Sequence, residues 1–245
     1  MKVGAAALSG GVLGVLGTLC FFLAFATDYW LVASDDCGRT EMLKVTQDEN
    51  GTVITVLEHV TPSALTLHHE GFFWRCVFPV EITAEPHLST LYTNQPESKV
   101  CIHGYLFPLP VAIGPVPHPM YDPTAVFRGF WTVLIVLALL CALIGGFLLV
   151  CGVPFYSHKL YRVGGALLIA AACLFLAVLL LYVMWVELVD VRRYILQENG
   201  KTCPAAEVQI HYGLSFMVGA AGVPLVLVSG ITFMCIARAL GGDKF

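Results

Sequence analysis

Four long apolar runs without a single charged residue constrain this chain more than any other feature of its sequence. Each run is longer than the roughly 20 helical residues that cross the hydrocarbon core of a bilayer. Only 12% of the chain is charged, against about 25% in soluble domains. We therefore predict an integral membrane protein. The runs cover residues 3–27, 129–158, 163–186 and 208–237, and the predicted transmembrane helices cover about 5–27, 128–152, 162–187 and 211–237.

The first run has an alternative interpretation as a cleaved signal peptide. Lys2 supplies a basic start, and residues 24–26 have the small-residue pattern of a cleavage site. However, the apolar core of a signal peptide is only about 7 to 15 residues long. A stripe of small residues at every fourth position also suits close packing against another helix. The sequence therefore favours a retained helix, with a stripe formed by Ala6, Gly10, Gly14 and Thr18.

Small residues on the other three runs predict a tight four-helix bundle, because they let helix backbones approach one another closely. They are Gly145 and Gly146 in the second run, Gly164, Gly165, Ala166 and Ala170 in the third, and Gly219, Ala220 and Gly222 in the fourth. The runs hold no Asp, Glu, Lys or Arg, whereas transporters and intramembrane hydrolases normally keep such residues inside the bundle. The sequence therefore disfavours those two classes of protein.

The two longer loops, residues 28–127 and 188–210, are predicted to lie outside the cell. Positive charges do not decide this orientation, because the second outer loop carries several of its own. The first loop contains the sequon Asn50-Gly51-Thr52 and two cysteines spaced as a bridge, and both features belong to an oxidising exterior. We therefore predict a multi-pass plasma-membrane protein with cytoplasmic N- and C-termini and a glycan on Asn50.

The first outer loop is predicted to form a small extracellular antiparallel β-sheet that stands on the membrane. β-branched and aromatic residues indicate strands at residues 53–57, at about 71–83 and at about 100–106. Three consecutive aromatic residues, 72–74, lie in the middle strand. We expect their rings to form the core of so small a domain, and a patch that faces a partner or the membrane is the alternative.

Two aromatic pairs and one charged segment mark the outer membrane boundary. Tyr29 with Trp30 and Phe130 with Trp131 stand next to apolar runs, where an interfacial belt of aromatic residues is expected. After Trp185 a charged helical pattern continues. We therefore predict that the third helix projects beyond the membrane.

The nine cysteines fall into two groups. Four lie outside and allow three pairings, whereas five lie in the spans or at their cytoplasmic ends, where disulfides are not expected. Cys151 and Cys235 lie near the cytoplasmic surface, which makes them candidates for S-palmitoylation, with burial as small apolar side chains the alternative. The outer four are Cys37, Cys76, Cys101 and Cys203.

No catalytic, metal or cofactor site is predicted. The six histidines of the first outer loop show neither His-Glu-x-x-His nor Cys-x-x-Cys spacing, and we interpret them as scattered surface residues. No nucleophile and base are placed by spacing, so we expect no enzyme, no small-molecule substrate and no nucleic acid partner. The same loop carries a net charge of −8, which attracts cations or a basic partner or only keeps the loop soluble. The histidines are His59, His68, His69, His87, His103 and His118.

Along its whole length, the chain resembles the claudin and peripheral-myelin-protein superfamily of four-span membrane proteins. The resemblance rests on four spans, a long first outer loop and a set of motif residues. The chain departs from typical claudins in the single residue between Trp74 and Cys76, in the wider spacing of the two cysteines, and in final residues that lack a Tyr-Val ending. These departures count against paracellular sealing. The motif residues are Trp30, Gly71, Phe72, Phe73, Trp74, Cys76, Cys101 and Arg128.

The resemblance implies a left-handed four-helix bundle under an extracellular sheet, with a disulfide between Cys76 and Cys101 that joins two strands. A second disulfide, between Cys37 and Cys203, would tie the two outer loops together. Members of the superfamily act as junction proteins or as regulators of larger proteins in the same membrane, and none is an enzyme through this motif.

We therefore predict a non-enzymatic regulator embedded in the lipid bilayer. Its first outer loop, at its acidic portion and at residues 72–74, binds the ectodomain of another membrane protein. The partner that the resemblance implies is an integrin β subunit, with a role in myogenesis. The alternative is a junction protein that forms a paracellular barrier or cation pathway.

Overall fold

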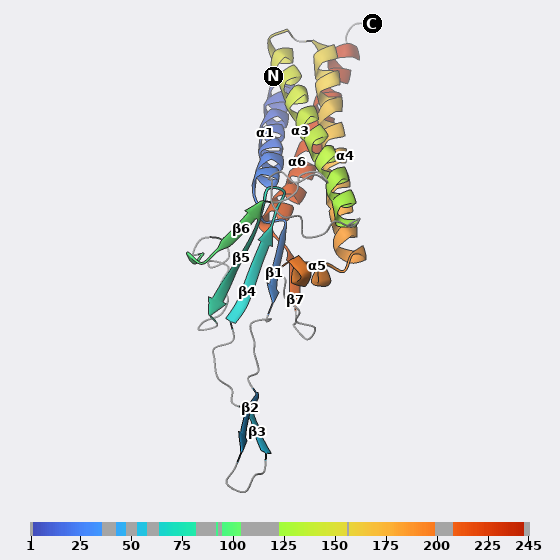
Figure 1. Cartoon of the computed structure of the whole chain (residues 1–245). Coiled ribbons are helices and arrows are strands. Elements are labelled where there is room, and N and C mark those ends of the chain that lie inside the picture. Colours follow the sequence, from blue (N-terminus) through green and yellow to red (C-terminus); the bar gives the residue numbers. More distant parts are fainter. Residues whose placement is uncertain are drawn as a thin grey trace.

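The computed structural model describes residues 2–35, 43–47, 53–57, 64–81, 92, 95–103, 123–155, 157–198 and 208–242. Within them, four helices are long and apolar enough to cross a membrane. They form a bundle with a five-stranded antiparallel sheet at one end (Figure 1), which confirms the predicted fold class. The helices are α1 (Lys2–Ala26), α3 (Pro123–Phe155), α4 (His158–Leu188) and α6 (Leu214–Gly242).

Helix α6 packs against both α1 and α4, and α4 also packs against α3. Gly10 and Gly14 of the predicted small-residue stripe face α6, which agrees with the expected contact with another helix. The hydroxyl of Ser229 in α6 donates a hydrogen bond of 2.7 Å to the carbonyl of Gly10. A Cβ added to Gly14 would lie only 2.6 Å from the same hydroxyl oxygen. The first apolar run is therefore an integral part of the bundle.

Glycines also line the other helix contacts. A Cβ added to Gly145 in α3 would lie 3.0 Å from the carbonyl oxygen of Gly164 in α4. A Cβ added to Gly165 would lie 2.9 Å from the carbonyl oxygen of Gly230 in α6. Gly146 differs from the prediction, because nothing lies within 4 Å of a Cβ at that position. Two adjacent helical residues point in different directions, so only one of the pair can face α4.

The five strands of the main sheet have the order β6-β5-β4-β1-β7, and all neighbours are antiparallel. Strand β7 crosses from the predicted second loop (188–210) into the first residues of the predicted fourth span (211–237), whereas the sequence predicted strands only in the first loop. One sheet therefore joins segments from both predicted outer loops and lies at the end of α1 and α6. The strands are β1 (Leu31–Asp35), β4 (Ala64–Glu70), β5 (Trp74–Glu81), β6 (Val100–His103) and β7 (Val208–Tyr212).

The predicted strands differ from the observed ones in two respects. The strand expected at residues 53–57 is β3 (Val53–Leu57), but it pairs with β2 (Leu43–Gln47) in a separate two-stranded hairpin. Figure 1 shows this hairpin apart from the main sheet. The middle strand begins at Trp74 rather than at Gly71, because residues 71–73 form the turn between β4 and β5.

The helical extension predicted after the third span is a separate helix, α5 (Val191–Glu198). The carboxylate of Asp190 accepts a hydrogen bond of 3.1 Å from the backbone N–H of Arg193, which is the contact of a helix N-cap. Val191 and Ile195 are buried in the same core as β1. Helix α5 therefore covers one face of the sheet beside the bundle.

The replacement Gly17→Ala should destabilise the bundle. A Cβ on Gly17 would lie 2.6 Å from Cγ2 and 2.9 Å from the backbone nitrogen of Val226 in α6. Backbone atoms cannot rotate away, so we expect a loss of about 1–3 kcal/mol, measured as a lower midpoint of thermal unfolding in detergent. Gly11→Ala is the matched control, because nothing lies within 4 Å of its added Cβ. Equal midpoints for the two variants would contradict tight packing between α1 and α6.

Candidate functional site

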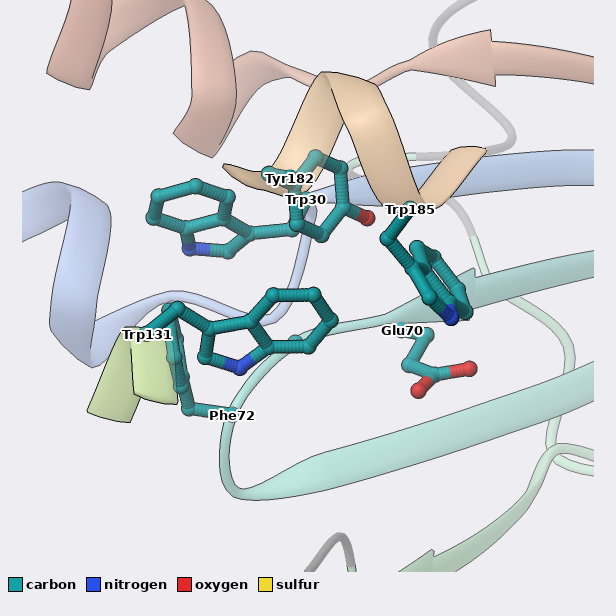
Figure 2. Close-up of a pocket in the computed structure, with 7 residues that line it drawn as sticks. Trp30, Glu70, Phe72, Trp131, Tyr182 and Trp185 are labelled. Carbon is teal, nitrogen blue, oxygen red and sulfur yellow. The ribbon is translucent and has the colours of Figure 1, made fainter. Parts of the chain in front are cut away.

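The bundle and the sheet meet in a cluster of buried aromatic side chains, which we call the aromatic joint. The ring of Trp30 lies 5.0 Å from that of Phe72 and 5.2 Å from that of Tyr182. Its indole N–H donates a hydrogen bond of 2.6 Å to the carbonyl of Ala24 in α1. The joint therefore brings α1, α3, α4 and the β4–β5 turn together. It consists of Trp30, Phe72, Trp131, Tyr182 and Trp185 (Figure 2).

Trp30 and Trp131 do not form the predicted belt of aromatic residues that face the lipid. Their side chains are 1% and 3% exposed, and Trp131 packs edge-on against Trp185 at 5.5 Å. Phe130, the neighbour of Trp131, is 63% exposed and keeps the predicted surface position. Sequence position alone cannot tell which of two adjacent aromatic residues turns inward at the end of a helix.

Gly71 allows the β4–β5 turn to approach the chain that leaves α1. A Cβ at Gly71 would lie 2.3 Å from the Cα of Asp28, so no side chain fits between the two backbones. The carboxylate of Asp28 accepts a hydrogen bond of 3.2 Å from the backbone N–H of Trp74. The N–H of Trp30 donates to the carbonyl of Glu70 at 2.9 Å. The motif glycine therefore serves close backbone packing.

The three consecutive aromatic side chains, 72–74, have different environments. Phe72 is 4% exposed and belongs to the joint. Phe73 is partly buried, and its ring lies 5.1 Å from that of Phe25 in the last turn of α1. Trp74 is 39% exposed. The expectation of a common core therefore holds for Phe72 and fails for Trp74.

The joint borders a cavity of only about 10 Å³, which Trp30, Trp131 and Tyr182 help to line. A cavity of this size holds at most one water molecule. Figure 2 shows the carboxylate of Glu70 beside the aromatic rings. The joint is therefore closely packed and connects the sheet to the bundle.

One buried and one largely buried pair of polar groups lie on one face of the sheet. His68 Nε2 and Asp35 Oδ2 form a hydrogen bond, and Arg75 Nε lies 3.3 Å from Glu70 Oε1. The first pair joins β4 to β1, and the second joins β4 to β5. A buried charge is costly unless it is paired. These pairs therefore favour one register of the three strands.

His69 lies on the opposite face, and burial lowers its pKa to about 4. Its ring stacks on Tyr29 at 4.4 Å, and its Nδ1 donates a hydrogen bond of 2.9 Å to the carbonyl of Asp28. Tyr29 accepts at its hydroxyl a hydrogen bond of 2.9 Å from Gln95. The interpretation as surface histidines is wrong for His68 and His69, which are 7% and 3% exposed. Within the described ranges, no three His, Cys, Asp or Glu side chains gather as metal ligands.

The disulfide between Cys76 and Cys101 is present and joins β5 to β6. Arg128 lies in the first turns of α3. Cys151 and Cys235 have free thiols, partly buried and exposed respectively. The remaining predicted sites, Asn50, Cys37 and Cys203, lie outside the described residues.

Comparison with known proteins supports the resemblance. A sequence model of the family described as PMP-22/EMP/MP20/Claudin tight junction matches residues 15–235. The chain is 38% identical to transmembrane protein 182 of Homo sapiens over 238 residues and 38% identical to that of Mus musculus over 240 residues. It is 37% identical to that of Gallus gallus over 245 residues. Each of these alignments covers between 96% and 98% of both proteins.

The pKa of His69 predicts a loss of stability in acid. The folded chain keeps this imidazole neutral down to about pH 4, whereas an unfolded chain takes up the proton near 6.5. The stabilising contribution is therefore complete above pH 6.5 and falls as the pH drops toward 4. Burial raises the pKa of Asp28. This shift makes the folded state relatively more stable as the pH falls, so it opposes the effect of His69 at the acidic end of the range. Thermal unfolding in detergent across this range measures the effect.

His69→Asn is the control for this prediction, because its amide can still donate to the Asp28 carbonyl but does not titrate. The decrease in stability between pH 6.5 and 4 should be smaller in this variant. An unchanged decrease would show that other groups cause the acid sensitivity.

Proposed function

Because this chain belongs to the PMP-22/EMP/MP20/claudin family of four-span membrane proteins, we propose that it binds and modulates another membrane protein in the same membrane. It does so without catalysis, by presenting its outer domain, which is the five-stranded sheet with its connecting loops, to the ectodomain of the partner. The partner that we propose is an integrin β subunit, in the plasma membrane of muscle cells during myogenesis. A basic surface on the partner would complement the net charge of −8 on the first outer loop.

The exposed apolar edge of the sheet is the observation that carries this proposal. Val100 and Ile102 of β6 are 64% and 52% exposed, and β6 pairs on one side only among the described strands. An edge strand with free backbone groups accepts an added strand from another protein. Phe72 is buried in the aromatic joint and does not face a partner. We therefore propose that β6, rather than residues 72–74, makes the contact.

Rigidity of this edge favours recognition of a partner. The disulfide fixes β6 to β5, and the aromatic joint fixes the sheet to the bundle. A rigid surface loses little conformational entropy when it binds. The outer domain therefore suits a role as a fixed platform beside a larger ectodomain.

The proposed topology places both outer loops outside the cell and both termini in the cytoplasm. Pairing of β1 with β7 supports placing the two loops on the same side of the membrane. It also supports the disulfide between Cys37 and Cys203. Asp35 pairs with Val208, so the segments that hold the two cysteines leave the sheet from the same end. Palmitoylation of the free thiols of Cys151 and Cys235 remains part of the proposal.

The second candidate function is a junction protein that seals or conducts between cells, and the tight-junction description of the family favours it. Expression in cells without junction proteins separates the two functions. We expect proximity labelling from the extracellular face to mark a larger membrane protein of the same cell. Concentration of the chain in strands at cell contacts, with changed transepithelial resistance and no such partner, would support the junction function instead.

The replacement Ile102→Lys should reduce capture of the partner at least severalfold, because it places a charge on the proposed contact edge. Gln209→Lys is the matched control, since Gln209 is exposed on β7 at the opposite edge of the sheet. Equal capture by both variants and the parent chain would exclude β6 as the contact.

Glycosidase treatment should increase the gel mobility of the parent chain, because the sequon at Asn50 lies in a loop that we place outside the cell. Asn50→Gln should migrate like the treated chain. If the parent chain shows no shift, the proposed orientation or the exposure of the sequon is wrong.

A further inference from the structure

We propose that the seam between α4 and α6, at the end of the bundle remote from the sheet, binds an anionic phospholipid. Arg162 of α4 and Arg238 of α6 hold the phosphate of its headgroup, and its acyl chains lie along the two helices. This site is independent of the partner proposed for β6, because it lies at the opposite end of the molecule (Figure 1).

Contacts between α4 and α6 show that the two arginines border one seam. A Cβ added to Gly165 in α4 would lie 2.9 Å from the carbonyl oxygen of Gly230 and 3.2 Å from Cγ of Met234 in α6. Arg162 precedes Gly165 by three residues, and Arg238 follows Met234 by four. Residues three or four apart lie on the same side of a helix. Both arginines therefore lie beside the line where α4 and α6 meet.

The positive charges at this seam have no counter-charge among the described residues. Arg162, Arg238 and the nearby Lys159 are exposed, and none of the three forms an ion pair within the part of the chain that the structure describes. The described residues at this end of the bundle include no Asp or Glu. Three such cations at a membrane surface attract anionic lipids.

The depth of the arginines identifies the ligand as a lipid. Arg162 directly precedes the charge-free run 163–186, and Arg238 directly follows the run 208–237. Long side chains at the ends of membrane-spanning helices place their charged groups at the headgroup level. A guanidinium group presents paired N–H donors that match the oxygens of a phosphate. The two arginines therefore suit the phosphate of a phospholipid.

Apolar surface continues from the arginines toward the middle of the membrane. Ala166 lies one turn beyond Arg162 on α4 and is exposed. Ile231 lies two turns before Arg238 on α6 and is 48% exposed. Both residues belong to helices that span the membrane. Acyl chains therefore cover this part of the seam when the headgroup lies at the arginines.

Electron paramagnetic resonance of the full-length chain in phosphatidylcholine vesicles tests the proposal. Phosphatidylserine and phosphatidylcholine with the same nitroxide on the acyl chain are compared by the fraction of each lipid that the protein immobilises. We expect the parent chain to prefer phosphatidylserine by roughly three- to fivefold. Replacement of both arginines, Arg162→Gln with Arg238→Gln, should remove most of this preference.

The double replacement Arg192→Gln with Arg193→Gln is the matched control, because it removes the same charge from α5 beside the sheet. This variant should keep the preference of the parent chain. An equal loss in both double variants would overturn the proposal, since the total charge rather than the seam would then select the lipid. A parent chain without any preference would overturn it as well.

The parent chain also provides a test that does not depend on the folding of a variant. The Debye length shrinks to about 3 Å in about 1 M salt, so the preference for phosphatidylserine should fall at least by half. An unchanged preference would show that the exposed arginines do not select the lipid, and the proposal would be wrong. Midpoints of thermal unfolding check that the two double variants are folded.

Discussion

Packing of Trp30 against Phe72 is the interaction on which the placement of the outer domain depends. Trp30 lies in the short connection between α1 and β1, and Phe72 lies in the turn between β4 and β5. Contact between the two rings therefore holds the α1–β1 connection and the β4–β5 turn against the end of the bundle. The indole hydrogen bond to Ala24 orients Trp30, and the absent side chain at Gly71 lets the turn come close. Both observations explain why these residue types occur at these positions.

The membrane part of the fold was predictable from the sequence, because a lipid environment excludes charge and demands long helices. The small residues at Gly10 and Gly14 also indicated a helix contact correctly. Gly146 could not be separated from Gly145, since the sequence does not show which of two adjacent residues faces the neighbouring helix. Trp131 and Phe130 present the same ambiguity.

The outer domain was less predictable, because its strands are short and pair over long distances in the sequence. Strand β7 begins in the predicted second outer loop and pairs with β1 in the first. His68 and His69 show another limit, since adjacent residues of one strand point to opposite faces and both faces are covered here. The candidate contact at residues 72–74 combined one buried ring, one partly buried ring and one exposed ring. Only the geometry of the β4–β5 turn shows which of these three rings is buried and which is exposed.

Pairing of β1 with β7 also affects how the protein is made. Strand β1 directly follows the first span, whereas β7 directly precedes the last one. During synthesis, β1 therefore lacks its second neighbour, β7, until almost the whole chain has been made. Non-local pairings of this kind form late in folding. The sheet is therefore completed only after the second of the two loops has been synthesised, and until then β1 has a neighbour on one side only, β4.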